Sequence, residues 1–472
     1  MNGIDIPAWM NSIKGDSITI DDIGGFPRNE IEYYYKKYSL LNENGYFISV
    51  DRDRGEQFSG ELVADTVKHT LANLRQLTFE TTDRCNLACE YCGYGKFYED
   101  YDTRTGKDMD TRTAIHLIDY LAEYWNSPLN QSHNRTVFIS FYGGEPLLNI
   151  DFIKQVIEYV HNLKTSRNRF AFSMTTNGLL IEKHMDFLVE NDFGLLISLD
   201  GNEENNGYRV LKNGSTAFNT IIKNIDALKN KYPGFFQNKV YFNAVLHNKN
   251  SVSSIYHFIK ERYNKTPFIA PLNNSGIKES MKKEFLETYR NLEESLYEGE
   301  DYLQIEQDMF ASLPNVQQIM EFLFEGSHFY FDDYTGLIDS GNEAKRIPTG
   351  TCIPFFKKLF LTVNGKILPC ERIGQLFPLG IASPDRIDLD LDRVAETYNN
   401  FYQQVRKQCT VCSKAEICKQ CIYNMDISPD GRLKCNSLVT RKTYSDYLAS
   451  LVSSLEEKPG MFSKIIDEVR VE

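Results

Sequence analysis

Long apolar runs are absent from this sequence of 472 residues. No stretch approaches the roughly 18 uninterrupted apolar residues that a membrane-spanning helix needs. The first ten residues, Met1 to Met10, also lack the basic and then apolar pattern of a signal peptide. We therefore expect a cytoplasmic protein that does not enter a membrane. Hydrophobic residues make up 42% of the chain, which is enough for one large catalytic domain with smaller flanking domains.

An excess of positive charge is missing as well. The chain has 52 Lys and Arg residues against 65 Asp and Glu, for a formal net charge of -13. Because this acidity is spread along the whole length, it would repel a phosphate backbone. We expect no nucleic-acid partner.

Cysteines are too few for a disulfide scaffold, but their positions are not random. Of the ten, three fall between residues 85 and 92, none in the next 259 residues, and seven between 352 and 435. In a reducing cytosol, thiolates at short spacings usually bind zinc or iron-sulfur clusters. The clustering therefore predicts metal sites.

Residues from 77 onward alternate short β-rich runs with helical patterns, as a parallel α/β domain does. Six units are too few for a closed eight-stranded barrel, so we expect an open, TIM-like partial (β/α)6 barrel with a wide mouth. Polar loops follow three of its strands, at YGGEP (142–146), TNG (176–178) and LDG (199–201). The six expected strands are Leu77–Thr81, Val137–Tyr142, Phe170–Thr175, Leu195–Leu199, Val240–Leu246 and Pro267–Pro271.

Four further segments flank this domain, which spans residues 73–272. Residues 1–72 carry a helical stripe with three tyrosines, then Gly45 and a strand-like run, and predict a small winged-helix-like module. Residues 273–350 are polar and helical in pattern, and read as a bridge or as solvated helices. A cysteine-rich domain (351–445) and a C-terminal helix (446–472) follow. The stripe consists of Ile31, Tyr34, Tyr35, Tyr38 and Leu41.

The first cysteine group has the spacing C-x3-C-x2-C directly after the first expected strand. Three thiolates on one loop can hold three irons of a 4Fe-4S cluster and leave the fourth iron without a protein ligand. S-adenosylmethionine (SAM) can chelate that open iron. The alternatives are a zinc site short of one ligand or a redox thiol pair with a spare cysteine. The three residues are Cys85, Cys89 and Cys92.

This motif, with the aromatic Tyr91 before its last cysteine, resembles the signature of the radical SAM superfamily. The resemblance implies that the three cysteines ligate the catalytic cluster and that Tyr91 packs near the adenine of SAM. It also implies that the GGEP segment, Gly143, Gly144 and Glu145, binds the amino group of the SAM methionine. Asn177 and Ser198 resemble polar SAM contacts of the family, and Arg209 is a candidate for the SAM carboxylate. Ordinary turn or strand-end roles stay open for these last three.

The second cysteine group resembles the SPASM domain, an extension of radical SAM enzymes that carries two auxiliary 4Fe-4S clusters. The family pattern has three residues where only Lys419 and Gln420 separate two of these cysteines. By the resemblance, the inner cluster takes Cys352, Cys370 and Cys421, and the outer cluster takes Cys409, Cys412, Cys418 and Cys435. Seven thiolates cannot fill eight sites, so the inner cluster should have an iron open to water, a carboxylate or a substrate thiolate. A zinc knuckle is the alternative.

Enzymes with this extension mostly act on ribosomally made peptides, so the resemblance implies a precursor peptide and a reductant such as flavodoxin or ferredoxin as partners. The expected activity is hydrogen abstraction followed by a side-chain cross-link, with residues 1–72 binding the leader. Glu371 lies where relatives that oxidise a protein side chain carry an acidic base, although a solvated glutamate fits too. The alternatives are oxidation of Cys or Ser to formylglycine, as in sulfatase maturases, and a non-catalytic metal-binding protein.

Overall fold

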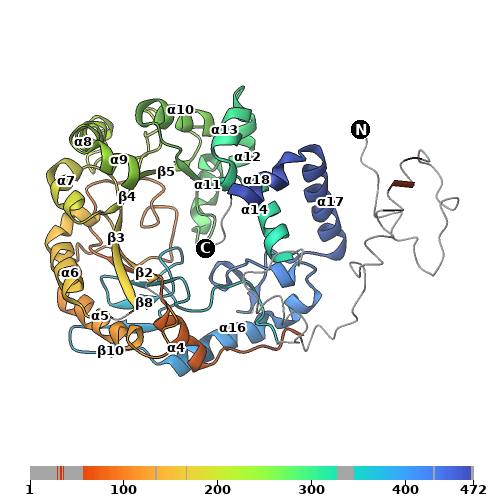
Figure 1. Ribbon diagram of the computed structural model, residues 1–472, viewed down its shortest axis with the longest axis horizontal. Coiled ribbons are helices and arrows are strands. Elements are labelled where there is room, and N and C mark those ends of the chain that lie inside the picture. The colour runs from red at the N-terminus through yellow and green to blue at the C-terminus, as the bar shows by residue number, and fades with distance from the viewer. Residues whose placement is uncertain are drawn as a thin grey trace.

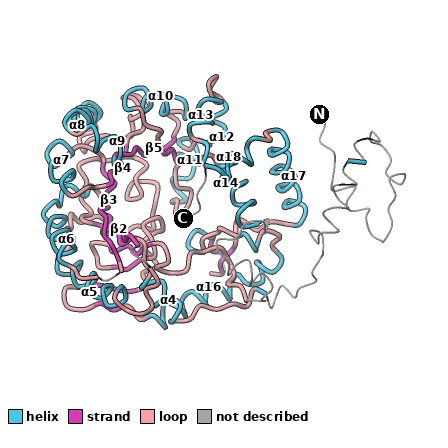
Figure 2. Tube along the Cα trace, viewed as in Figure 1, coloured by secondary structure: helices cyan, strands magenta, loops and turns pink. Residues whose placement is uncertain are grey.

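The computed structural model describes residues 57–132, 135–165, 167–326, 345–428 and 431–468, together with Asn29, Glu32, Tyr33 and Lys36. Most of the predicted N-terminal module, including the tyrosine stripe, lies outside the described residues. Ten strands form one sheet, and helices pack around its outer side (Figures 1 and 2). The first six strands are β1 (Gln76–Glu80), β2 (Arg135–Tyr142), β3 (Asn168–Thr176), β4 (Gly194–Ser198), β5 (Val240–Leu246) and β6 (Phe268–Pro271).

These six strands lie in chain order and are parallel throughout, which confirms the predicted partial (β/α)6 arrangement. Among the described strands the sheet does not close, since β6 and β10 are its two edges. The helices between these strands are α5 (Thr111–Trp125), α6 (Ile150–Asn162), α7 (Ile181–Glu190), α8 (Phe218–Lys231), α9 (Pro233–Lys239) and α10 (Val252–Tyr263), and α4 (Ala64–Ala72) precedes β1.

Four additional strands extend the sheet beyond β1, a feature that the sequence did not predict. β7 pairs with β1 in parallel, with Gln76 opposite Lys358, and β8 to β10 continue as antiparallel neighbours. The cysteine-rich segment is therefore tied to the first barrel strand by backbone hydrogen bonds. The strands are β7 (Lys358–Leu361), β8 (Lys366–Leu368), β9 (Gly380–Ala382) and β10 (Ile387–Asp388), with a separate hairpin of β11 (Asp426–Ile427) and β12 (Leu433–Lys434).

Alternation along the strands separates two faces. On β1, Leu77 and Phe79 are fully buried under the helices, whereas the other face carries Gln76 and Glu80.

The helices of the outer layer repeat their apolar residues every three to four positions, and α5 buries the predicted apolar stripe. The side chain of Asp110 caps the first turn of α5. It accepts a hydrogen bond from Arg112 N (2.8 Å) and so fixes where the helix begins. The stripe is Ala114, Leu117, Ile118, Leu121, Ala122 and Trp125.

The predicted bridge is a chain of short helices, of which α12 (Leu292–Tyr297) and α13 (Tyr302–Asp308) pack on α10, and it is not a solvated helix pair. Leu296, Ile305 and Ile319 are buried in the main core. The elements are η3 (Glu279–Met281), α11 (Lys282–Thr288), α12 (Leu292–Tyr297), α13 (Tyr302–Asp308), η4 (Phe310–Ser312), α14 (Pro314–Glu321) and the π-helical η5 (Phe322–Gly326).

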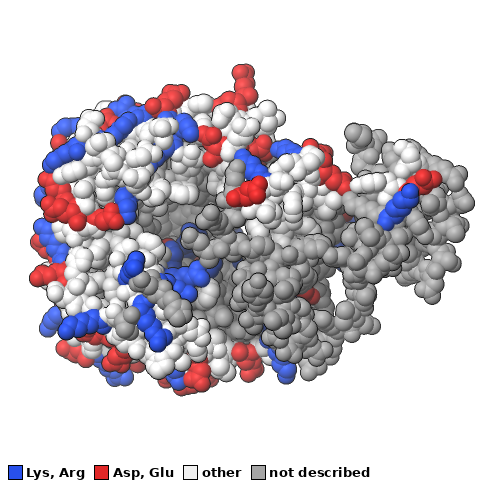
Figure 3. Space-filling view, viewed as in Figure 1, with Lys and Arg blue, Asp and Glu red and all other residues white. Residues whose placement is uncertain are grey.

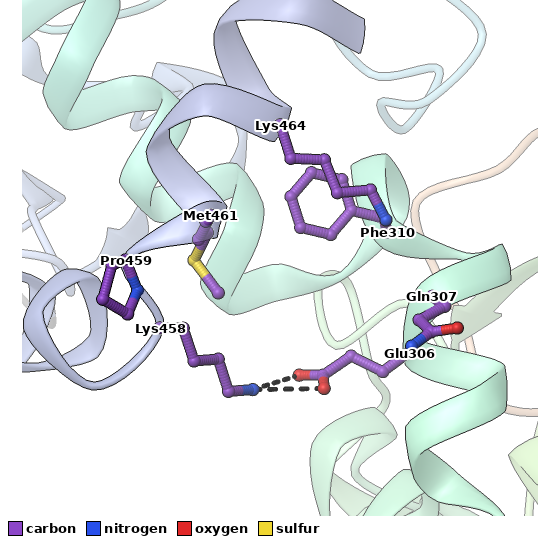
Figure 4. A pocket seen from close by; sticks show the side chains of 8 residues that line it. Glu306, Gln307, Phe310, Lys458, Pro459, Met461 and Lys464 are labelled. Carbon is purple, nitrogen blue, oxygen red and sulfur yellow. Dashed lines mark hydrogen bonds and ion pairs between the residues drawn. The ribbon is translucent and has the colours of Figure 1, made fainter.

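The C-terminal helices return to this bridge. The Lys458 ammonium forms a two-pronged ion pair with Glu306 (2.9 and 3.1 Å) beside a cavity of about 280 Å³ that also contacts Phe310 and Met461 (Figure 4). This ion pair links the segment between α17 and α18 to α13. The elements are α16 (Leu391–Val411), η6 (Ala415–Ile417), η7 (Ile422–Asn424), α17 (Arg441–Glu457) and α18 (Gly460–Glu468).

None of the helices in the described part of the chain is both long and apolar enough to cross a membrane. On the face drawn in Figure 3, acidic and basic side chains are interspersed over the helical layer. The first observation agrees with the lack of long apolar runs in the sequence, and the second with charged residues spread along its whole length.

Candidate active site and metal centres

The loop after β1 brings the three thiols of the first cysteine group into one neighbourhood. Burial raises the pKa of Cys89 to about 12; Arg209 opposes this shift, and the charges of Cys92 and Cys85 add to it. Three N–H groups point at the sulfurs: Leu87 N and Asn177 Nδ2 donate to Cys85 (3.4 and 3.8 Å), and an Arg104 nitrogen donates to Cys92 (3.6 Å). Such N–H···S contacts are typical of cluster-binding loops.

The three thiols of this loop are donors that suit a 4Fe-4S cluster. In the ranges the structure describes, no three His, Cys, Asp or Glu side chains converge on a position that could hold one metal ion. A zinc ion is shared by all of its ligands, whereas each thiolate of a 4Fe-4S site binds its own iron and stands farther from the others. The loop supplies three thiols, one for each of three irons of such a cluster.

The GGEP turn packs directly on the chain that enters this loop. Gly144 N donates to Thr82 O (2.9 Å) and Glu145 N to Arg84 O (2.8 Å). A Cβ on Gly143 would lie 2.4 Å from Thr82 O, and one on Gly144 would lie 2.0 Å from Arg84 O. The two glycines are therefore required for backbone contact with the cysteine loop, a role that the sequence did not predict.

Glu145 is fully buried and joins two loops. Its carboxylate accepts hydrogen bonds from Leu147 N (3.1 Å), Thr176 Oγ1 (2.8 Å) and Asn177 N (2.8 Å). Burial raises the pKa of Glu145 to about 7 despite these donors. Asn177 in turn donates to Asn86 Oδ1 (2.7 Å) in the cysteine loop. The GGEP turn, the TNG turn and the cysteine loop thus form one hydrogen-bonded unit.

A buried ionic cluster lies beneath Tyr91. The guanidinium of Arg209 makes two hydrogen bonds to Asp200 (3.0 and 3.2 Å), and the Tyr91 hydroxyl donates to the same carboxylate. The imidazole of His247 stacks on the Tyr91 ring, with centroids 5.6 Å apart. Burial opposes ionisation, but Arg209 and His247 hold the pKa of Asp200 down at about 2. The positive charge of Arg209 is therefore paired with Asp200. Ser198, another predicted SAM contact, lies at the end of β4, two residues before Asp200.

The seven C-terminal cysteines fall into two groups. Burial raises the pKa of Cys409 to about 11, and the charges of Cys418, Cys435 and Cys412 add to that shift. Cys421 has its pKa raised by burial and by Cys352. Cys370 has a pKa of about 11, raised by burial, Glu371 and Cys421. The assignment of these cysteines to an outer and an inner cluster stays a prediction of the resemblance.

Two tyrosines lie between the first cysteine group and the inner one. Burial raises the pKa of Tyr101 to about 12, with further contributions from Cys92, Cys370 and Glu371. Burial also raises the pKa of Tyr142, again with contributions from Cys92 and Glu371. Tyr142 nevertheless keeps 36% of its surface exposed, so its ring is not part of the packed core. Both tyrosines therefore lie close to Cys92 of the first cysteine group and to Glu371, the neighbour of Cys370.

Comparison with known proteins identifies the first part of this site. Residues 79–261 match the family described as the Radical SAM superfamily. This chain contains a radical SAM domain. The match begins within β1, covers the cysteine loop and the GGEP, TNG and LDG turns, and ends in α10.

The relatives differ in how much of each chain the match covers. A cysteine-type anaerobic sulfatase-maturating enzyme of Clostridium novyi is 28% identical over 64% of this chain and 74% of its own length. The radical SAM cyclopropyl synthase TigE of Paramaledivibacter caminithermalis is 26% identical over 37% of this chain and 35% of its own. An uncharacterized protein of Methanocaldococcus jannaschii is 34% identical, and the match spans 49% of its length. The chain thus spans only a third to a half of two of these relatives.

A solved structure shares the fold over most of the chain. The structure of anSMEcpe with bound AdoMet and the Cp18Cys peptide superposes with a TM-score of 0.53 over 82% of this chain and 99% of that chain, at 19% identity. At that identity the likeness shows the fold alone. It extends well beyond the radical SAM domain, since 82% of the chain exceeds the matched residues 79–261.

Outside the radical SAM domain, Glu371 is not a solvated surface glutamate. Its side chain is 15% exposed and pairs with the Lys358 ammonium at 2.5 Å. Its second oxygen, Oε2, is buried and has no hydrogen-bond partner among the residues that the structure describes. Glu371 therefore has one carboxylate oxygen without a described partner, close to Tyr101 and Tyr142.

Several site residues were not singled out from the sequence. Asp200 is the acidic residue of the LDG turn, and its place directly after a strand could have marked it as a site residue. A cavity of about 540 Å³ beside Cys85 was not predicted either. Its lining residues are Arg84, Cys85, Asn86, Leu148, Leu211, Lys212 and Asn213.

Proposed function

We propose that this chain is a radical SAM peptide maturase, which abstracts a hydrogen from a ribosomally made precursor peptide and installs a side-chain cross-link. The cross-link would be a thioether, a carbon-carbon or a carbon-oxygen bond. The observation that carries the proposal is the position of Tyr101 and Tyr142, which both lie close to Cys92 of the first cysteine group and to Glu371 beside Cys370. A substrate held there would lie between the two cysteine groups.

Cys85, Cys89 and Cys92 would hold the catalytic 4Fe-4S cluster, and the GGEP turn with Asn177, Ser198 and Arg209 would contact SAM. The cavity beside Cys85, at about 540 Å³, has the size of a small-molecule site. Two further 4Fe-4S clusters would occupy the inner and outer C-terminal sets, for three in all. When bound, these groups supply the electron that cleaves SAM to the 5′-deoxyadenosyl radical and accept the electron that the substrate loses.

The residues of the chain would orient and deprotonate the substrate. Tyr91 is fixed from two sides, by its hydrogen bond to Asp200 and by the stacked His247, so its ring is a rigid wall for the adenine. The peptide loses one hydrogen atom to the radical, and then one proton and one electron. Glu371 is the acceptor for that proton, because its Oε2 has no hydrogen-bond partner among the described residues and its other oxygen is held by Lys358.

Two partners belong to the same proposal. A leader-recognition role for residues 1–72 is carried by the sequence pattern alone. A low-potential reductant such as flavodoxin or ferredoxin would deliver the electrons.

The test is turnover with SAM, dithionite and synthetic precursor peptides encoded beside the gene. Loss of two hydrogens from the peptide, together with 5′-deoxyadenosine, is the expected result. SAM cleavage with an unmodified peptide across all candidates would contradict the peptide assignment but leave the radical SAM assignment intact.

A second candidate is oxidation of a protein Cys or Ser to formylglycine. It is favoured by the Clostridium novyi relative, whose match covers 64% of this chain and so extends beyond the radical SAM domain. A sulfatase-derived peptide separates the two candidates. Exchange of its cysteine sulfur for an aldehyde oxygen supports formylglycine formation, and zinc binding without SAM cleavage would support a non-catalytic metal protein instead.

A further inference from the structure

Arg104 is a cation that lies directly against the first cysteine group. One of its terminal nitrogens is 3.6 Å from the sulfur of Cys92. Its guanidinium also covers the ring of Tyr94, with Cζ 4.1 Å from the ring centroid. Neither Arg104 nor Tyr94 is among the residues that the sequence predicted for the site.

The backbone around Arg104 is anchored to the cysteine loop. Thr105 N and Lys107 N both donate to the carboxylate of Asp83 (2.8 Å each), two residues before Cys85. Asp83 is buried, with 4% of its surface exposed. Arg104 is therefore held in place by its own segment.

Tyr94, on which Arg104 stacks, is fixed as well. Its hydroxyl donates to Glu80 at the end of β1 and accepts from Gln375 Nε2 (2.8 Å). Gln375 stands five residues after Cys370 and is 2% exposed. The platform for the Arg104 guanidinium is thus clamped between the barrel and the C-terminal domain.

The charge of Arg104 is not neutralised by contact. Within the described ranges no carboxylate forms an ion pair with it, and its Nε is buried without a hydrogen-bond partner. Glu80 lies close enough to sense the charge, but its oxygens are occupied by Tyr94 and by Val363 N (2.9 Å). Arg209, the other guanidinium near the thiols, differs because it is paired with Asp200 at 3.0 Å.

We propose that Arg104 donates an N–H···S hydrogen bond to the Cys92 thiolate and raises the reduction potential of the cluster held by this loop. Each one-electron reduction, here by an external reductant, adds one negative charge to the site. A fixed positive charge and a hydrogen bond to sulfur both stabilise the reduced form more than the oxidised one. Arg104 is then a positioning and tuning residue, and this inference rests on the proposed catalytic cluster.

The experiment is a redox titration of the full-length, reconstituted protein, followed by electron paramagnetic resonance. The signal to follow is the one that changes on addition of SAM, because it belongs to the cluster at Cys85, Cys89 and Cys92. Arg104→Gln should shift its midpoint potential to a more negative value. Lys107→Gln is the matched control, since it removes one positive charge from the same segment but the Lys107 amine donates to Asn364 Oδ1 (3.2 Å) and not to sulfur.

An unchanged potential in Arg104→Gln, or an equal shift in Lys107→Gln, would overturn the inference. Arg104→Lys keeps the charge but loses the planar group, so its potential should lie between those of the parent and Arg104→Gln. If Arg104→Gln takes up no iron, a parent-like potential in Arg104→Lys would overturn the inference as well. Absence of any SAM-responsive cluster in the parent would instead contradict the proposed function.

Discussion

Lys358 and Glu371 form an ion pair of 2.5 Å that joins the first residue of β7 to the residue after Cys370. Lys358 lies opposite Gln76 of β1, so the pair stands on the strand that connects the two cysteine groups. The pair fixes the orientation of Glu371, while its Oε2 has no hydrogen-bond partner in the described part of the chain. This arrangement is what a proton acceptor needs.

Replacing Glu371 by Gln should separate radical formation from product formation. We expect SAM cleavage to continue and modified peptide to fall by roughly 100-fold or more, the usual effect of losing a general base. Mass spectrometry of the peptide and chromatography of 5′-deoxyadenosine measure the two quantities. Asp426→Asn, an exposed change in β11, is the control and should alter neither. Unreduced peptide modification in Glu371→Gln would remove the base from the mechanism.

The GGEP turn should not tolerate a side chain. A methyl group on Gly144 would lie 2.0 Å from Arg84 O, so Gly144→Ala must displace the cysteine loop. We expect a loss of about 2 kcal/mol or more in the free energy of unfolding, and weaker iron binding. Gly234→Ala is the comparison, because a Cβ there meets nothing within 4 Å. Equal stability of the two variants would refute the close contact.

Glu145 makes stability depend on pH. Its folded pKa of about 7 lies above the ordinary value of 4.5 because of burial. A raised pKa means that the folded state binds the proton more tightly, so this contribution is complete below about pH 4.5 and is lost as the pH rises through 7. The shift corresponds to an upper limit of about 3 kcal/mol.

Urea unfolding of the parent and of Glu145→Gln at several pH values checks this prediction. The parent should lose stability relative to the variant between about pH 5 and pH 7.5. The opposite slope, or parallel curves, would mean that Glu145 is ionised in the fold across that range. The comparison within each pH removes the effects of all other titrating groups.

The barrel strands were predictable because their patterns are local. Val240–Leu246 was predicted with the bounds that the structure shows, since buried and exposed positions alternate along it. Strands β7 to β10 were not predicted, because two to four residues carry too little periodicity. The position of β7 beside β1 depends on pairing between residues such as Gln76 and Lys358, far apart in the chain.

In the site, too, local patterns were predictable from the sequence, whereas contacts between residues far apart in the chain were not. The short cysteine spacings predicted an outer and an inner set among the C-terminal cysteines, and this assignment stays a prediction. Arg104 follows no motif and reaches Cys92 only because Asp83 anchors its backbone. The pairing of Arg209 with Asp200 likewise depends on a buried contact that the sequence does not signal.

The measurement that tests the central claim most directly is iron and sulfide content after anaerobic reconstitution. It should be run on the parent and on a variant with Cys85, Cys89 and Cys92 changed to Ala. Three clusters predict about twelve irons per chain in the parent, and about eight in the variant with SAM cleavage abolished. Zinc in place of iron, or only four irons in the parent, would contradict the account of the C-terminal cysteines.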